Sequence, residues 1–166
     1  MRDYHLDISI PEYRERIHLA FLKRLNSGDF TAEDGFWELV SRLRRRGIKT
    51  ALCTSSTREQ VETTFITLLG RTKLFYRLED VFDAVITADD VTHLKPHPEP
   101  YLTAAAKLEL SPGDCIVLED TALGVESAKK AGCYCVGLRR PYNDLDRPPL
   151  PDFVIDSINE LNFESV

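Results

Sequence analysis

Apolar stretches of two different periods alternate along this chain of 166 residues, and this alternation is the strongest constraint on its fold. Short stretches rich in β-branched and apolar residues predict strands at 48–53, 83–87, 115–118, 133–138 and 152–155. Helical periodicity fills the intervals, at 36–46, 57–69, 98–108 and 122–131. Because the strands are continuously apolar, both of their faces must be covered by helices. The sequence therefore predicts an α/β fold with a doubly wound parallel sheet.

The first 29 residues do not share this rhythm. An amphipathic helix is predicted over 11–25, with Pro11 near its start, and residues 4–10 alternate like a short strand. Loop-forming residues at 26–29 mark a boundary between modules. We therefore expect residues 1–29 to be separate from an α/β core over residues 30–166.

Charge and hydropathy argue against two classes of partner. The chain has 27 acidic and 21 basic residues, a net charge of −6, which is the wrong sign for a sequence-independent nucleic-acid binder. The chain has no apolar run as long as a membrane span, and its first residues do not lead into a signal peptide. We expect a cytoplasmic protein with no nucleic acid and no membrane as partner. The four cysteines fit neither a disulfide framework nor a zinc ribbon, so buried reduced thiols are expected.

Polar residues follow three of the predicted strands, at the edge of a parallel sheet where ligands bind. After the first strand come Thr54 and Ser55, whose hydroxyls and N–H groups at a helix start suit a phosphate. The alternative is helix capping, because Ser56 with Glu59 and Thr57 with Gln60 each fit a capping box. Thr54 precedes both boxes and is the better candidate for binding.

Lys95 lies in a proline-rich loop after the second strand. Pro96, Pro98 and Pro100 restrict the backbone there, so the loop is predicted to be stiff, which favours a functional lysine that neutralises phosphate or carboxylate. A solvated surface lysine is the alternative. His93 and His97 flank Lys95, but no cysteine or third histidine is near them, and a zinc site is not expected.

Glu119 and Asp120 directly follow the third apolar strand. Two adjacent carboxylates at the edge of a core repel each other, and a divalent cation would relieve that repulsion. Mg²⁺ fits best, because it takes one or two protein carboxylates together with water and phosphate oxygens. In the alternative, Asp120 or Thr121 only caps the helix that follows.

These features together resemble the haloacid dehalogenase superfamily, within it the phosphatases and phosphomutases similar to β-phosphoglucomutase and phosphoglycolate phosphatase. The resemblance covers about residues 30–160 and is carried, in order, by segments 47–56, 81–101 and 115–132. It implies a Rossmann-like core, with residues 1–29 as the remnant of a helical cap.

The resemblance also implies roles for the polar residues. Thr54 would hydrogen-bond the transferring phosphoryl group together with the Ser55 backbone, and Lys95 would steady the nucleophile and the phosphate. Glu119 and Asp120 would hold Mg²⁺, directly or through water.

The family's first motif, an apolar strand ending in D-x-D that supplies the nucleophile, is absent from these residues. The D-x-D at 144–146 follows Arg140-Pro141-Tyr142-Asn143 and is predicted to be a surface loop. In the family the nucleophile strand lies between the strands that end here at Cys53 and Leu118. Residues 4–10 are one candidate for that position, in the same chain or in a neighbouring one.

We therefore expect the C-terminal part of a Mg²⁺-dependent phosphatase or phosphomutase for a small phosphorylated metabolite, inactive as this chain because the nucleophilic aspartate is missing. The alternative is a non-catalytic phosphate-binding or metal-binding scaffold derived from the same fold. A strand-swapped homodimer or a separate complementing chain could fill the strand position.

Overall fold

The computed structural model describes residues 9–27, 31–72 and 77–161, and divides into two compact units, 1–32 and 33–166. The described part of the first unit is one helix, α1 (Ile10–Asn26), which confirms the helix predicted over 11–25. Ser9 caps it by accepting a hydrogen bond from the Glu12 N–H at 3.3 Å. Residues 4–8 of the predicted strand lie outside the described residues, and Ile10 belongs to α1. That this unit is the remnant of a cap stays a prediction.

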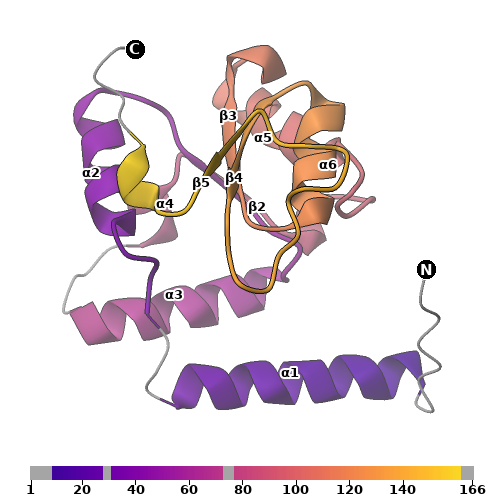
Figure 1. Ribbon diagram of the computed structural model, residues 1–166. Coiled ribbons are helices and arrows are strands. Elements are labelled where there is room, and N and C mark those ends of the chain that lie inside the picture. Colours follow the sequence, from indigo (N-terminus) through magenta and orange to yellow (C-terminus); the bar gives the residue numbers. More distant parts are fainter. Residues whose placement is uncertain (1–8, 28–30, 73–76, 162–166) are drawn as a thin grey trace. The chain divides into compact units, whose positions relative to one another are not determined.

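The second unit contains the five strands that the sequence predicts, each with parallel neighbours (Figure 1). They are β1 (Ala51–Cys53), β2 (Ala84–Ile86), β3 (Ile116–Glu119), β4 (Tyr134–Leu138) and β5 (Phe153–Ile155). β1 pairs with β2, and β3, β4 and β5 pair in that order. The α/β class and the parallel pairing are confirmed.

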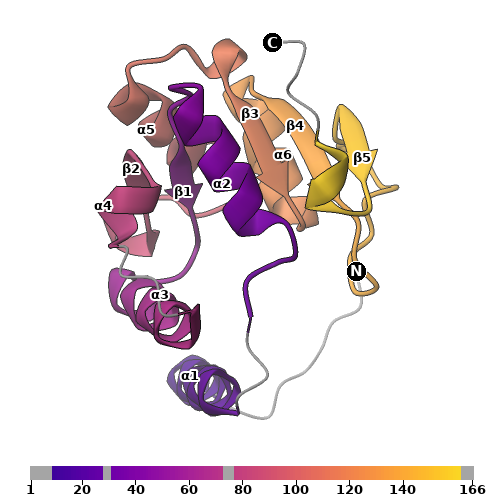
Figure 2. The same ribbon diagram turned by 90° about the vertical axis from the view of Figure 1, so that its left-hand side faces the viewer.

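Helices cover both faces of these strands, as predicted (Figure 2). α5 (Glu99–Leu108) and α6 (Ala122–Ala131) lie on one face, and α2 (Phe36–Arg45) packs with α3 (Arg58–Thr72) and the short α4 (Leu78–Val81) on the other. Short 3-10 turns complete the unit at Ala88–Asp90, Pro112–Asp114 and Ile158–Glu160.

Strand β4 shows why the strands are continuously apolar. Its buried Cys135 packs in a cluster with Val125 and Ala128 of α6, whereas the next residue, Val136, packs with Leu39 of α2. Successive side chains of a strand point to opposite faces, so a strand covered on both sides needs apolar residues at both phases.

The strands form two sheets rather than one. Among the described residues no hydrogen-bonded ladder joins β1 to β3, so β1 and β3 each have a strand partner on one side only. This break falls between Cys53 and Leu118, the strand ends that flank the nucleophile strand in the resembling family.

Within the described residues no helix is long and apolar enough to cross a membrane. The four cysteines are free thiols, with Cys133 and Cys135 buried and Cys53 and Cys115 half-buried.

Candidate functional site

Lys95 connects the ends of the two sheets. Its Nζ donates a hydrogen bond to the backbone carbonyl of Cys53 at the end of β1, at 3.1 Å, and forms an ion pair with the carboxylate of Glu119 at the end of β3. Only 11% of the Lys95 side chain and 7% of the Glu119 side chain are exposed. The alternative of a solvated surface lysine is therefore wrong, and the lysine reaches across the break between the sheets.

The Glu119 carboxylate has further donors besides Lys95. The Tyr101 hydroxyl of α5 donates to it, and the Thr121 hydroxyl does so at 3.0 Å. Burial, together with the charge of Glu119, raises the pKa of Tyr101, so the phenol stays protonated and donates. Gly124 makes room for this carboxylate, because a Cβ there would overlap the carboxyl group. Glu119 is thus a buried acceptor.

The loop that carries Lys95 is held from both sides. The Glu99 carboxylate accepts hydrogen bonds from the Thr92 and His93 N–H groups, at 2.7 and 2.9 Å. The buried hydroxyl of Ser127 in α6 donates to the His97 carbonyl at 2.6 Å. These contacts, with the prolines, agree with the stiff loop that the sequence predicts.

Thr54 and Ser55 lie at the end of β1, one and two residues beyond the carbonyl that Lys95 binds. The Thr54 hydroxyl accepts a hydrogen bond from the Ser56 N–H at 3.1 Å, and the Ser55 side chain is exposed. Capping is also present nearby, because Thr57 and Gln60 form the reciprocal pair of a capping box, at 3.0 and 3.3 Å. The capping alternative is therefore confirmed for Thr57 and leaves Thr54 and Ser55 as the phosphate candidates.

Asp120 lies apart from Glu119 although the two are adjacent in sequence. Its carboxylate accepts a hydrogen bond from the Tyr142 hydroxyl at 3.1 Å and borders a cavity of about 370 Å³ that Asn143 and Arg147 also line. Partial burial and the bond to Asp120 raise the pKa of Tyr142. Asn143 donates to the carbonyl of Asp120 at 2.9 Å. Sequence reasoning missed Tyr142 and Asn143; their one signal is a cluster of turn-forming residues after β4.

The two carboxylates differ in how well they fit the expected Mg²⁺. Glu119 faces the ammonium group of Lys95, and this contact offsets the charge that a cation was expected to relieve. Both of its oxygens already have protein donors. Asp120 keeps a carboxylate at a cavity, which fits the one or two protein ligands that Mg²⁺ commonly takes beside a phosphate. Thr121, not Asp120, caps α6 through the Gly124 N–H at 3.0 Å.

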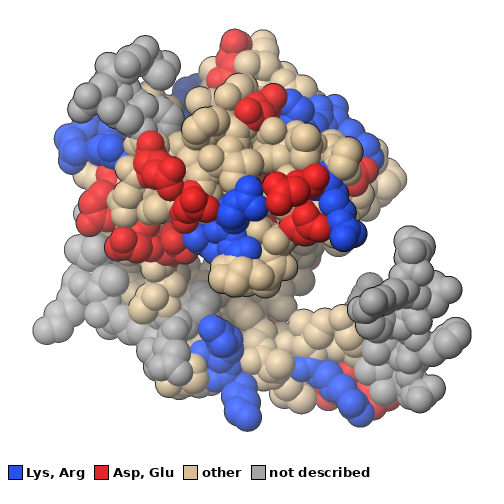
Figure 3. Space-filling view, in the orientation of Figure 1, with Lys and Arg blue, Asp and Glu red and all other residues tan. Residues whose placement is uncertain are grey.

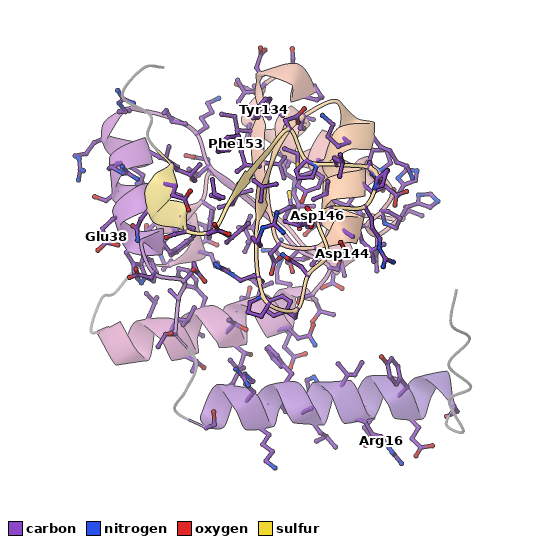
Figure 4. All side chains as sticks on the ribbon, in the orientation of Figure 1. Arg16, Glu38, Tyr134, Asp144, Asp146 and Phe153 are labelled. Atoms are coloured by element: carbon purple, nitrogen blue, oxygen red, sulfur yellow. The ribbon has the colours of Figure 1, made fainter. Side chains whose placement is uncertain are left out.

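The D-x-D at 144–146 is a surface loop, as predicted. Figure 4 shows Asp144 and Asp146 on the long loop between β4 and β5, and both are exposed. Arg147 pairs with Asp144 at 2.7 Å and Arg139 pairs with Asp146 at 3.3 Å. On the face shown in Figure 3, acidic and basic side chains of the second unit are interspersed rather than gathered into one basic patch.

The chain is similar to known hydrolases and phosphatases. A family model described as haloacid dehalogenase-like hydrolase matches residues 11–132. The chain is 34% identical over 133 residues to validoxylamine A 7'-phosphate phosphatase from Streptomyces hygroscopicus subsp. limoneus, covering 80% of this chain and 58% of that protein. It is 42% identical over 82 residues to phosphoglycolate phosphatase from Salmonella paratyphi A, covering 48% of this chain and 32% of that protein.

Solved structures agree with the sequence relatives. The crystal structure of β-phosphoglucomutase from Clostridium difficile matches 92% of this chain and 61% of that one, with a TM-score of 0.66 and 25% identity. The chain spans less than two thirds of the length of each of these three proteins.

Proposed function

The chain belongs to the haloacid dehalogenase-like hydrolases, and from this we propose that it is the phosphate-binding part of a phosphatase or phosphomutase for a small phosphorylated metabolite. The observation that carries the proposal is the placement of Lys95, whose ammonium group is held at the ends of β1 and β3. Ligands of open parallel α/β folds bind beyond this edge. A cation fixed there offsets negative charge on a transferring phosphoryl group.

The neighbouring residues take complementary roles in this proposal. Thr54 and the Ser55 N–H bind phosphoryl oxygens, because both lie at the end of β1 next to the Lys95 contact. Glu119 is a positioning residue that holds Lys95. Asp120 is the carboxylate that would hold Mg²⁺, which when bound would neutralise phosphate charge. This assignment narrows the expected pair of metal ligands to one.

We propose that the nucleophile comes from outside these 166 residues. We infer that an aspartate at the end of an apolar strand enters between β1 and β3, where each has a free edge in the described structure. The carboxylate oxygen would attack phosphorus, the bond from phosphorus to the substrate oxygen would break, and that oxygen would take a proton from water as it leaves. Water would then cleave the acyl phosphate, releasing inorganic phosphate and restoring the carboxylate. The strand can belong to a longer form of this protein, to a separate chain or to a swapped neighbour.

Two assays test the proposal. Phosphate binding is measured by calorimetry with inorganic phosphate and Mg²⁺, and we expect Lys95→Met to abolish it while Lys130→Met, on an exposed pair with Glu126, leaves it unchanged. Turnover is measured with p-nitrophenyl phosphate and Mg²⁺, alone and after co-expression with a segment containing an apolar strand ending in D-x-D-G-T. We expect turnover only with the segment.

Other outcomes would contradict the proposal. Mg²⁺-dependent turnover by the chain alone, lost in Asp120→Ala, would show that the nucleophile lies within these residues. Phosphate binding without any turnover in the co-expressed complex would favour the second candidate, a non-catalytic scaffold. That candidate has support in the structure, because Lys95 and Thr54 already have protein partners.

A further inference from the structure

Two histidines and a glutamate gather on the loop that carries Lys95. One possible ligand atom from each of His93, His97 and Glu99 lies within 4.8 Å of those of the other two. The two imidazole rings stack, with their centroids 4.4 Å apart and 29° between their planes. His93 Nδ1 is 2.8 Å from Glu99 Oε2, and His97 Nδ1 is 3.9 Å from the same oxygen. Two imidazoles and one carboxylate, side chains that bind transition metals, thus lie close together at the surface.

The carboxylate of this group is fixed before any ligand arrives. It accepts the N–H groups of Thr92 and His93, and these hydrogen bonds together with the His93 side chain hold the pKa of Glu99 below its usual value. The Glu99 N–H donates to His97 Nδ1 at 3.2 Å, which brings that ring back over the start of α5. Pro96 lies between the two histidines and restricts the backbone there, so the three side chains stay near one another.

We propose that His93, His97 and Glu99 form a binding site for Zn²⁺ or a similar divalent transition metal, completed by water. Two imidazoles and one carboxylate with an open position are a donor set that zinc accepts, and the His-x₃-His spacing is one that zinc sites use. Imidazole suits Zn²⁺, Ni²⁺ and Cu²⁺, whereas Mg²⁺ prefers oxygen ligands. The site therefore discriminates against the ion expected at Asp120.

Closing the site requires only local movement. Ligand atoms around a tetrahedral zinc lie roughly 3.3–3.6 Å apart, given bonds of about 2.0–2.2 Å. The side chains of His93 and His97 are 61% and 48% exposed, so ring rotation can bring their nitrogens closer by the remaining ångström or so. Rotation gives up the stacking of the two rings, the contact of the His93 ring with Glu99 and the contact of His97 with the Glu99 N–H, and metal bonds take their place.

The expectation of no zinc site rested on the lack of a cysteine or a third histidine near His93 and His97. Glu99, two residues beyond His97, supplies a carboxylate as the third ligand instead. A metal bound here would link both ends of the segment 93–97, at whose centre Lys95 points inward to Glu119. His93 and His97 are exposed and take no part in the proposed phosphate site.

Calorimetric titration of the full chain with ZnCl₂ tests the proposal. We expect one strong zinc site. Its affinity should fall at least tenfold in each of His93→Gln and His97→Gln, and an excess of MgCl₂ should not reduce zinc binding. Co²⁺ should give visible d–d absorption bands that both variants lose. Far-UV circular dichroism verifies that the variants are folded.

Matched controls address the other zinc-binding side chains. His18→Gln removes an exposed histidine of α1, and Cys115→Ser removes a half-buried thiol; neither should change the affinity by more than twofold. Burial raises the pKa values of Cys53, Cys133 and Cys135 to about 11 or 12, which disfavours the thiolate form that binds zinc. Absence of zinc binding, unchanged affinity in the His93→Gln/His97→Gln double variant, or loss of affinity in either control would overturn the proposal.

Discussion

Replacing Lys95 by methionine should destabilise the second unit through the charge that it leaves behind. Glu119 would remain 7% exposed with the hydroxyls of Tyr101 and Thr121 as its donors. Removing one partner of a buried ion pair costs about 3–5 kcal/mol. The carbonyl of Cys53 also loses its side-chain donor, which costs about 1 kcal/mol. Because Glu119 keeps these two hydroxyls and the Thr121 N–H, at 3.4 Å, we expect a loss near the lower end, about 3 kcal/mol.

A double-variant cycle separates the ion pair from other effects of the substitution. Glu119→Gln keeps an acceptor for Tyr101 but removes the charge, so the variant Lys95→Met/Glu119→Gln leaves no buried ion unpaired. Its loss of unfolding free energy should be smaller than the sum of the two single losses by about 2 kcal/mol. Lys130→Met is the matched control: its side chain is 51% exposed and its pair with Glu126 is worth at most about 0.5 kcal/mol.

Urea unfolding at neutral pH, followed by circular dichroism, measures the four unfolding free energies of the cycle and that of the Lys130→Met control. The slopes with urea must agree between variants for the comparison to hold. A Lys95→Met loss no greater than that of Lys130→Met would refute the reasoning, as would single losses that simply add. Either result would mean that water or another donor already compensates Glu119.

Three further outcomes are expected. Hydrogen bonds from Thr87, and Arg58 beside them, lower the pKa of Asp90 to about 2; because an unfolded aspartate titrates near 3.9, this stabilisation holds above about pH 4 and is lost toward pH 2. The unfolding free energy from urea should therefore decrease less between pH 5 and pH 2.5 in Asp90→Asn than in the wild type. An equal decrease in both proteins would contradict this role of Asp90. Gly124→Ala should lower the free energy of unfolding by at least about 2 kcal/mol, because the methyl group displaces the Glu119 carboxylate. Helix propensity alone predicts a gain of about 1 kcal/mol. Gly113→Ala, whose methyl group meets no neighbour, is the control in the same urea assay. Ellman's reagent at pH 8 should react first with the half-buried Cys115, since burial raises the pKa values of the other three thiols to about 11 or 12, and Cys115→Ser should remove that fast phase.

The elements of the fold could be predicted because their signals are local. The apolar run of β4 and the glycine that ends α6 both lie within a few residues of the structure they determine. Gly132 adopts a positive φ of 84° directly after that helix, a conformation that favours glycine. The stiffness of the Lys95 loop likewise follows from prolines within the loop itself.

The orientation of the two carboxylates could not be predicted in the same way. Successive residues at a strand end point to opposite sides, but the sequence does not say which side is the interior. In the structure Tyr101, 18 residues before Glu119, and Gly124 in the next helix decide that Glu119 faces inward. Tyr142 reaches Asp120 from a loop 22 residues away. Such contacts depend on tertiary packing rather than on any local pattern.

The contact of Lys95 with β1 affects which strands could pair with the free edge of β1. The Thr54 N–H donates to Ile86 of β2, so the backbone groups of Cys53 face the other way, toward the position between the sheets. There the ammonium group occupies the Cys53 carbonyl that an added strand would otherwise use. A strand that displaced Lys95 without supplying a new acceptor would leave a buried donor unsatisfied, at a cost of about 1–3 kcal/mol. Under the proposed function, an aspartate-bearing strand would supply that acceptor, whereas a strand without one would pair with this edge less favourably.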